Sequence, residues 1–322
     1  MSDNGVNLHT DLISLEEKLN EIDAQIVNFK KMVADEGIEL TEVIDILERK
    51  KVLLLDGLDA WQKTLIARHK DRPKALDYIN GIFDEFVELS GDRHVMDDLA
   101  IIGGMAYLEG RPVVVIGQEK GTTTELKIKR NFGMPHPEGY RKAMRIMRMA
   151  EKFKKPIITF VDTQGAYPGI AAEERGQALA IAENLKQMSR LAVPIVVVVI
   201  DEGGSGGALA IAVGDRILML KYSIYSVITP EGCASILFKD AAKAPLAANA
   251  LRITSDDLYR FGIIDEIIPE APGGAHRDAA SSIAGVKEAI IRNLDELMGL
   301  SAEDILVSRY QKFRKMGRFT TF

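Results

Sequence analysis

The chain has 322 residues, 47% of them hydrophobic, which is enough for one large or two modest domains with a substantial core. A net charge of −6 argues against a general nucleic-acid-binding protein, although a local basic patch would still allow such binding. The single cysteine, Cys233, excludes an internal disulfide framework and a zinc site built from cysteines. The N-terminus shows no export signal, and no run approaches the roughly 18 apolar residues of a membrane-spanning helix. We therefore expect a soluble protein of a reducing cytoplasm.

Residues 1–70 are predicted to form an N-terminal helical hairpin. Ser14 and Glu17 have the spacing of a capping box, and apolar residues then recur at heptad-like intervals until Gly37. A second helix is predicted from Thr41 to about His69. Two helices cannot bury both apolar stripes alone, so we expect the hairpin to pack on the main body or, as the preferred interpretation, on another subunit.

Residues 71–322 are predicted to form the main α/β domain. A helix is expected over 74–90, and the pattern then changes to two strands, 99–108 and 112–116, around a tight Glu109-Gly110 turn. Further strands are expected at 156–161, 195–200, 215–220, 223–228 and 263–268. Further helices are expected from 137, over 170–191 and 208–212, from Pro230 after a Thr229 cap, over 239–252, after a Ser255 cap, and in a final region broken near 299–301.

The segment 122–153 is rich in cations. They are Lys127, Lys129, Arg130, Arg141, Lys142, Arg145, Arg148 and Lys152. Its helix contains only Glu138 and Glu151 to balance them. A solvated helix face and a binding surface for an anionic ligand or acidic partner are equally consistent with this pattern.

Two buried strands each end in a glycine-rich turn. The strand 156–161 runs into DTQGAYPG at 162–169, and the strand 195–200 runs into Asp201 and GGSGG at 203–207. Backbone amides at such turns suit a bound anion or a developing oxyanion. One turn alone is as readily explained by close packing of helix on strand. Two turns at the same ends of neighbouring parallel strands favour a functional backbone site.

Other catalytic patterns are absent from the sequence. The glycine turns do not spell GxGxxG or GxxxxGK[ST], and Ser205 is not in a GxSxG elbow. The histidines His9, His69, His94, His136 and His276 are scattered and predict no metal cluster. Cys233 is expected to be a packed thiol, and Glu173-Glu174 to complement a helix dipole. The turns therefore best support stabilisation of a carbonyl oxygen that gains charge.

Several segments carry a specific resemblance. They are RNFGMPHPEGYRKA, DTQGAYPG, AEERGQ, EGGSGGALAI, YSVITPEGCASILFKD, APLAA and GGAHR. Together they resemble the carboxyltransferase α subunit of bacterial-type acetyl-CoA carboxylase over nearly the whole chain beyond about Asp59. The resemblance implies an α/β, crotonase-like (ClpP/crotonase) fold of stacked ββα units with an N-terminal helical hairpin and C-terminal helices.

The resemblance also implies the reaction and the partners. CO2 would move from carboxybiotin, held on a separate biotin carboxyl carrier protein, to acetyl-CoA to give malonyl-CoA, in the first committed step of fatty-acid synthesis. The enzyme would be an α2β2 assembly, with biotin carboxylase in the wider complex. The β subunit would supply a second oxyanion hole, most of the CoA site and a zinc ribbon. No metal is expected on this chain, and it should be inactive alone.

The residues implied by the resemblance are those of the glycine turns. The amides around Gly206, Gly207, Gly165 and Ala166 would form the oxyanion hole for the ureido oxygen of biotin. The biotin pocket would be lined by Gly204, Ser205, Tyr167 and Pro168. Two departures from the family pattern are Gln164, where many members have proline, and Asp201, where many have glycine.

Three alternatives are left open. Another biotin-dependent acyl-CoA carboxyltransferase, such as a propionyl-CoA type, would share the fold and differ in an acyl pocket on the partner chain. A self-sufficient crotonase-type hydratase or decarboxylase would need a catalytic carboxylate and would work without a partner. A non-enzymatic protein could use the cations of 127–152 to bind an acidic protein or nucleic acid.

Overall fold

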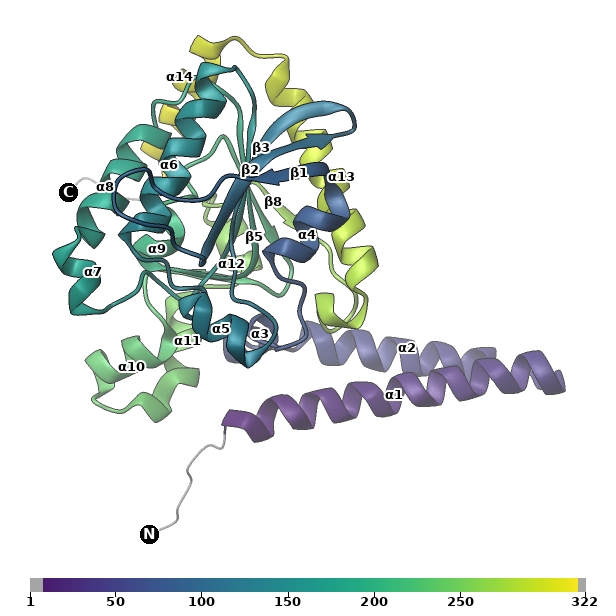
Figure 1. Ribbon diagram of the computed structural model, residues 1–322. Coiled ribbons are helices and arrows are strands. Elements are labelled where there is room, and N and C mark those ends of the chain that lie inside the picture. Colours follow the sequence, from purple (N-terminus) through teal and green to yellow (C-terminus); the bar gives the residue numbers. More distant parts are fainter. Residues whose placement is uncertain (1–7, 318–322) are drawn as a thin grey trace, which may run out of the picture.

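The computed structural model describes residues 8–317, with side chains from Ser14 onward. The described part excludes residues 1–7 and 318–322. The first of these ranges begins the segment that is expected to carry no export signal. The centre of the molecule is an eight-stranded sheet in the order β1-β2-β3-β4-β5-β6-β8, with β7 paired to β5 (Figure 1). The strands are β1 (Asp84–Glu88), β2 (Ile101–Leu108), β3 (Arg111–Gln118), β4 (Ile157–Thr163), β5 (Ile195–Gly204), β6 (Arg216–Leu220), β7 (Ile224–Ser226) and β8 (Glu266–Ile268).

The sheet is mixed. β1, β2 and β3 are antiparallel, and β3, β4, β5, β6 and β8 are parallel neighbours in that order. The predicted tight turn between β2 and β3 is confirmed, with Glu109 and Gly110 both at positive φ. The prediction of a single helix over 74–90 is wrong. The helix α4 (Ala75–Ile82) ends at Ile82, and β1 follows as an edge strand paired with β2. Because Phe83 is already extended at the helix end, the apolar residues after it continue on a strand.

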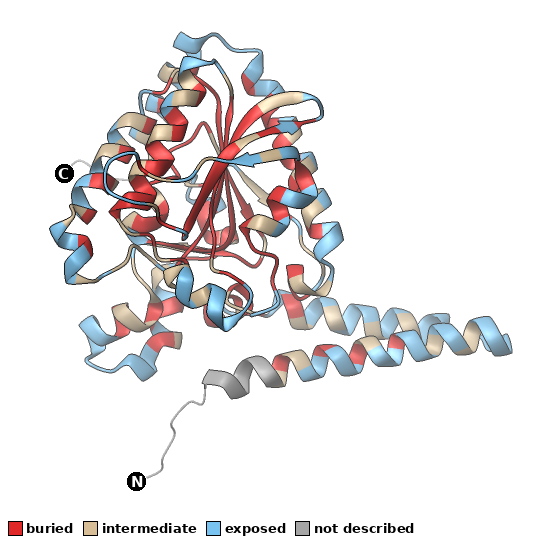
Figure 2. Ribbon diagram, viewed as in Figure 1, coloured by how far each residue is buried: buried red, intermediate tan, exposed pale blue. Residues whose placement is uncertain are grey.

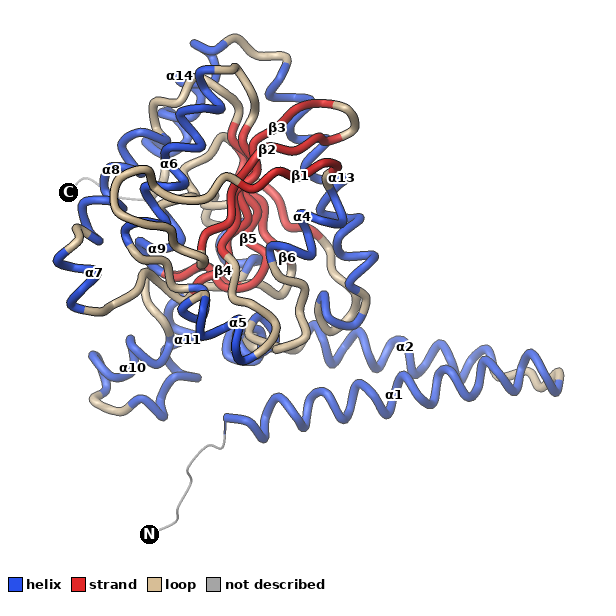
Figure 3. The backbone as a smooth tube through the Cα atoms, in the orientation of Figure 1, coloured by secondary structure: helices blue, strands red, loops and turns tan. Residues whose placement is uncertain are grey.

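Helices cover both faces of the sheet, as the apolar run in β5 predicts. Val197 and Val199 point into one core with α6 (Pro137–Lys152), α8 (Gln177–Met188) and α9 (Ser205–Leu209). Val196, Val198 and Ile200 point into the other core, beneath α4 and α13 (Ala279–Met298). The strands therefore form a buried layer between two helical layers (Figures 2 and 3).

The N-terminal helices lie side by side and project beyond the main body (Figure 1). α1 (Leu8–Glu36) begins before Ser14, so the predicted capping box at Ser14 is wrong. The second predicted helix is two helices, α2 (Thr41–Asp56) and α3 (Ala60–Ala67), because Asp59 forms a capping box with Gln62 that starts a new helix. α3 packs on the main body, against α11.

Several predicted boundaries also need correction. The helix expected over 170–191 is divided into α7 (Ile170–Glu174) and α8, because Gly176 has a left-handed φ of 85°. Thr254, not Ser255, caps α12 (Ser255–Arg260), and β7 and β8 are shorter than expected. The break near 299–301 is confirmed between α13 and α14 (Ala302–Lys315). The remaining helices are α5 (Thr124–Lys129), α10 (Pro230–Phe238), α11 (Ala244–Leu251) and the short 3-10 turns Asn131–Gly133, Ala241–Lys243 and Ala275–Arg277.

No helix in the described part of the chain combines the length and the apolar character that crossing a membrane requires.

One arginine attaches the C-terminal helix to the sheet. Arg309 of α14 is 1% exposed and forms two charge-assisted hydrogen bonds with the Asp215 carboxylate, at 2.8 and 2.7 Å. Its remaining N–H groups donate to the backbone carbonyls of Met188, Leu191 and Val193. The guanidinium therefore supplies hydrogen-bond donors to the backbone carbonyls at the end of α8 and in the loop before β5, as well as to the buried carboxylate.

We predict that Arg309→Met lowers the free energy of unfolding by about 3–5 kcal/mol, because it leaves the Asp215 carboxylate buried without its partner. Arg314→Met is the matched control, since Arg314 is an exposed arginine of the same helix. Urea unfolding of both variants measures the difference. Equal midpoints would show that the Arg309 bonds contribute nothing to stability.

Candidate functional site

The two glycine turns lie together at one edge of the sheet. β4 and β5 are parallel neighbours, and their pairing continues to Thr163 opposite Gly203. A Cβ added to Gly204 would lie 2.1 Å from the carbonyl oxygen of Gln164, and one added to Gly207 would lie 2.4 Å from the amide nitrogen of Ala166. The two turns are therefore in direct backbone contact, which only glycine permits at these positions.

Three of the predicted donor amides are free. The amides of Gly206, Gly207 and Ala166 have no acceptor within residues 8–317. The Gly165 amide instead donates to Oγ1 of Thr163, at 3.1 Å. α9 begins at Ser205, three residues before the predicted helix 208–212, and has only five residues, so the local N–H groups contribute more than a helix dipole does.

A mostly apolar pocket of about 500 Å³ opens beside the second turn. Ser205 and Gly206 form part of its wall, together with Leu209, Tyr225, Ser226, Val227, Leu251, Arg252, Ile253, Leu258, Phe261 and Ile263. Ser205 has a left-handed φ of 54°, and its side chain is exposed. Such a conformation is costly for a residue other than glycine and is found at functional turns.

The other predicted biotin-pocket residues do not line this pocket. Gly204 is buried in the sheet, and Pro168 is exposed. The ring of Tyr167 packs on His136, with ring centroids 4.2 Å apart. The structure thus places Ser205 and Gly206 on the pocket wall and leaves Tyr167 and Pro168 on the neighbouring loop.

Gln118, at the end of β3, is a residue that sequence reasoning missed. Its buried side-chain amide donates to the carbonyl oxygen of Gly207 at 2.8 Å, and its side-chain oxygen accepts the amide of Asp162 at 3.2 Å. One side chain therefore holds both glycine turns. A polar residue at the end of an otherwise apolar strand was the only signal in the sequence.

Buried ion pairs support the turns from below. Asp201 accepts hydrogen bonds from Nε of Arg72 at 2.5 Å and from Nζ of Lys74 at 2.8 Å, and Arg72 also pairs with Glu270. Burial alone would raise the pKa of Asp201, but the charges of Lys74 and Arg72 outweigh it and hold the pKa below its ordinary value. The departure at Asp201 is thus compensated by two cations.

A second group of charges lies at the first turn. Nζ of Lys120 is 2.5 Å from the Asp162 carboxylate and 3.6 Å from Glu202, which also binds Arg68. Burial raises the pKa of Asp162 to about 6, against the opposing charge of Lys120. Lys120 and Gln164 line a separate pocket of about 450 Å³. The departure at Gln164 therefore places an exposed polar side chain at this pocket.

Most cations of α6 are neutralised inside the chain. Arg141 pairs with Asp92 and Glu138, and the buried ammonium of Lys142 pairs with Asp97. Arg145 donates to the carbonyls of the segment 89–91. Neither predicted interpretation of this helix, a solvated face or a binding surface, describes these three residues, because each of them has an acceptor in the segment 89–97, which is distant in sequence.

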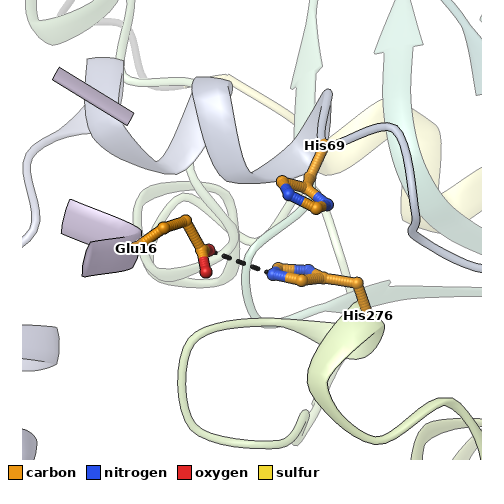
Figure 4. A group of neighbouring side chains, drawn as sticks. All are labelled: Glu16, His69 and His276. Carbon is orange, nitrogen blue, oxygen red and sulfur yellow. Dashed lines mark hydrogen bonds and ion pairs between the residues drawn. The ribbon is translucent and has the colours of Figure 1, made fainter. Parts of the chain in front are cut away.

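The histidines are not all scattered. His69 and His276 stack with ring centroids 3.9 Å apart, and Nε2 of His276 lies 3.1 Å from Oε1 of Glu16 (Figure 4). The three groups could hold a metal by proximity. The hydrogen bonds of the two rings do not suit a metal ion, however. Nδ1 of His69 already accepts a hydrogen bond from the backbone amide of Asp71. A His276 ring that bound a metal through Nε2 would carry its proton on Nδ1, but this buried nitrogen has no acceptor in the described chain. The cluster instead joins α1 to the main body.

Cys233 is buried among apolar residues, as predicted.

Comparison with known proteins identifies relatives over almost the whole chain. Residues 12–317 match the family model described as acetyl co-enzyme A carboxylase carboxyltransferase-like. The chain is 56% identical to acetyl-coenzyme A carboxylase carboxyl transferase subunit alpha of Geobacter metallireducens over 308 residues, covering 96% of each chain. It is 49% identical to the protein of the same name from Thermus thermophilus, covering 95% of this chain and 98% of the other.

Solved structures share the fold at low identity. A Pseudomonas malonate decarboxylase hetero-tetramer in complex with coenzyme A matches with a TM-score of 0.58 and 16% identity, over 73% of this chain and 91% of the other. Transcarboxylase 12S matches with a TM-score of 0.54 and 20% identity, over 66% and 41%. The predicted crotonase-like α/β fold is confirmed by these neighbours.

The contact between the turns predicts opposite outcomes for two adjacent glycines. Gly207→Ala should lower the free energy of unfolding by about 1–3 kcal/mol, because its methyl group meets backbone that cannot move aside. Gly206→Ala should be neutral or slightly stabilising, since its methyl group would meet only the Ile181 side chain, at 3.5 Å. Urea unfolding measures both. Equal effects would contradict the proposed close approach of the turns.

Proposed function

The chain belongs to the acetyl-CoA carboxylase carboxyltransferase family as a subunit alpha, and we propose that its two glycine turns hold the carboxybiotin from which CO2 passes to acetyl-CoA. It is a component of a biotin-dependent carboxyltransferase that forms malonyl-CoA. The observation that carries the site assignment is the set of free amides at Gly206, Gly207 and Ala166, of which Gly206 forms part of the wall of an apolar pocket.

The residues present fit a biotin ring. The pocket of about 500 Å³ has room for an apolar bicyclic ring, and Gly206 brings a free amide to its wall without a side chain. When bound, carboxybiotin supplies the CO2, and its ureido oxygen gains negative charge. The amides of Gly206 and Gly207, with Ala166 across the contact, would donate hydrogen bonds to that charge.

The chain stabilises this charge by preorganisation. Gln118 and the contact at Gly207 fix the donors before the substrate arrives, so no reorganisation is needed during the reaction. Buried apolar wall residues such as Ile253 and Leu258 exclude water from their side of the pocket and strengthen each hydrogen bond. One such donor is typically worth about 3 kcal/mol of transition-state stabilisation.

The β subunit would bind over α10 and α11. Exposed apolar side chains gather there: Val227, Ile236, Leu237, Phe238 and Leu246. Val227 also lines the apolar pocket, so a partner at this surface would close over the biotin site. We assign to the β subunit the acyl-CoA site and a zinc ribbon, within an α2β2 assembly.

The wider system would include biotin on its carrier protein and a biotin carboxylase. The single cysteine fits a cytoplasmic location, and the formation of malonyl-CoA fits a role in fatty-acid synthesis.

The proposed function is tested in the reverse direction, as malonyl-CoA-dependent carboxylation of a biotin analogue. We expect no activity with this chain alone or with the β subunit alone, and activity in the mixture, because each chain holds part of the site. Activity of the lone chain would instead indicate a self-sufficient crotonase-type enzyme. An inactive mixture that forms the complex would contradict carboxyl transfer.

The partner surface is tested by a charge in its apolar centre. Leu237 is 68% exposed, and Leu237→Asp should weaken binding of the β subunit at least about tenfold, because an unpaired carboxylate would be buried on assembly. Val307→Asp, on exposed α14, is the control and should bind normally. Sedimentation of α and β mixtures gives both affinities. Equal binding by the two variants would place the β subunit elsewhere.

A further inference from the structure

The outer face of α2 is apolar and uncovered. Within the described residues of α2, only Leu55 is buried. Ile44, Leu47 and Leu54, on the inner side, are partly buried. On the opposite side Ile46 and Leu53 are 62% and 72% exposed, and Val43 is also exposed. The projecting hairpin thus leaves half of its second helix without a packing partner (Figure 2).

These exposed residues form one stripe. Val43, Ile46, Lys50 and Leu53 follow one another at steps of three, four and three residues, which is the spacing of a coiled-coil seam. We call these four residues the outer stripe. A lysine within such a seam can lay its alkyl chain on an apolar neighbour while its ammonium reaches a carboxylate at the edge.

The charges in and beside the outer stripe are divided between the two halves of the helix. Glu42 and Asp45 lie in the first half, and Arg49 and Lys50 in the second. None of these four side chains forms an ion pair with another residue of the described chain. Their neighbours do: Glu48 pairs with Lys30 of α1 at 3.0 Å, and Lys51 pairs with Asp23 at 2.6 Å. The charged side chains of α2 that face α1 thus have ion-pair partners, whereas the four that face away from it have none in the described chain.

We propose that α2 pairs antiparallel with α2 of a second copy of this chain, through the outer stripe. A twofold axis between Ile46 and Lys50 sets Val43 opposite Leu53 of the second copy and Ile46 opposite its Lys50. Glu42 and Asp45 of each helix then lie near the basic half of the other, with Arg49 and Lys50. The hairpins form the contact between α subunits.

The charge pattern selects this occupant. Parallel pairing would place acidic half on acidic half and basic half on basic half, which is repulsive. A twofold contact brings the same surface of both copies together, so the charges of the helix must complement those of an identical helix that runs in the opposite direction. Pairing of α2 with α2 through the outer stripe also buries the apolar side chains that the two-helix hairpin leaves exposed.

The inference does not depend on carboxyl transfer, because the surface lies on the hairpin and the experiment measures association. The outcome of the association experiment is therefore independent of the outcome of the reverse-reaction assay.

The experiment reverses charge in each half of α2. One variant, Glu42→Lys/Asp45→Lys, makes both halves basic; the other, Arg49→Glu/Lys50→Glu, makes both acidic. We expect the full-length wild-type chain to form dimers in analytical ultracentrifugation, and each variant alone to dimerise at least about tenfold more weakly. Mixing the two variants should restore dimers, because each basic half then meets an acidic half.

Lys152→Glu/Lys186→Glu is the control, since it changes net charge as much as the acidic variant at exposed positions away from the hairpin. It should dimerise like the wild type. Circular dichroism checks that every variant is folded. A monomeric wild-type chain, equal dimerisation of all variants, or failure of the mixture to recover would overturn the proposal. Loss of β-subunit binding with unchanged α–α association would assign the surface to the β subunit instead.

Discussion

The site depends on one steric constraint, the backbone contact between the two glycine turns. Gly204 lies on the carbonyl of Gln164, and Gly207 lies on the amide of Ala166, so closely that neither position has room for a side chain. This contact brings the amides of two separate strand-to-helix connections to one place. It explains why the glycines are needed: they permit the approach, and the donors are the free N–H groups that result.

The constraint is maintained by groups buried beneath the turns. Gln118 bonds to both turns, and Asp201 is held by Arg72 and Lys74. Buried ion pairs add little net stability compared with apolar packing, yet breaking one is costly. Their value here is geometric, because each charged partner fixes a strand end that leads directly into a turn. Rigidity at the turns therefore comes from polar contacts, while the apolar cores on both faces of the sheet stabilise the fold.

Local patterns were sufficient to predict the strands β2 to β6, the paired turns and the break before α14. The apolar run of β5 predicts a buried parallel strand, and the glycine clusters mark where the connections begin. Long-range pairing was not predictable. Nothing near Lys142 in sequence indicates that Asp97 neutralises it, and His69 and His276 are far apart until the chain folds. β1 was mistaken for helix because Phe86 continues the helical spacing of α4, and only pairing with β2 determines its conformation.

The central claim is that the free amides of the second turn bind the ureido oxygen of biotin. The most direct test is a structure of the assembled α and β subunits with a biotin analogue bound. We predict that the ureido oxygen lies about 2.7–3.1 Å from the amide nitrogens of Gly206 and Gly207, with the ring in the apolar pocket. A ring bound elsewhere, with both amides unoccupied or bonded to the partner chain, would contradict the account.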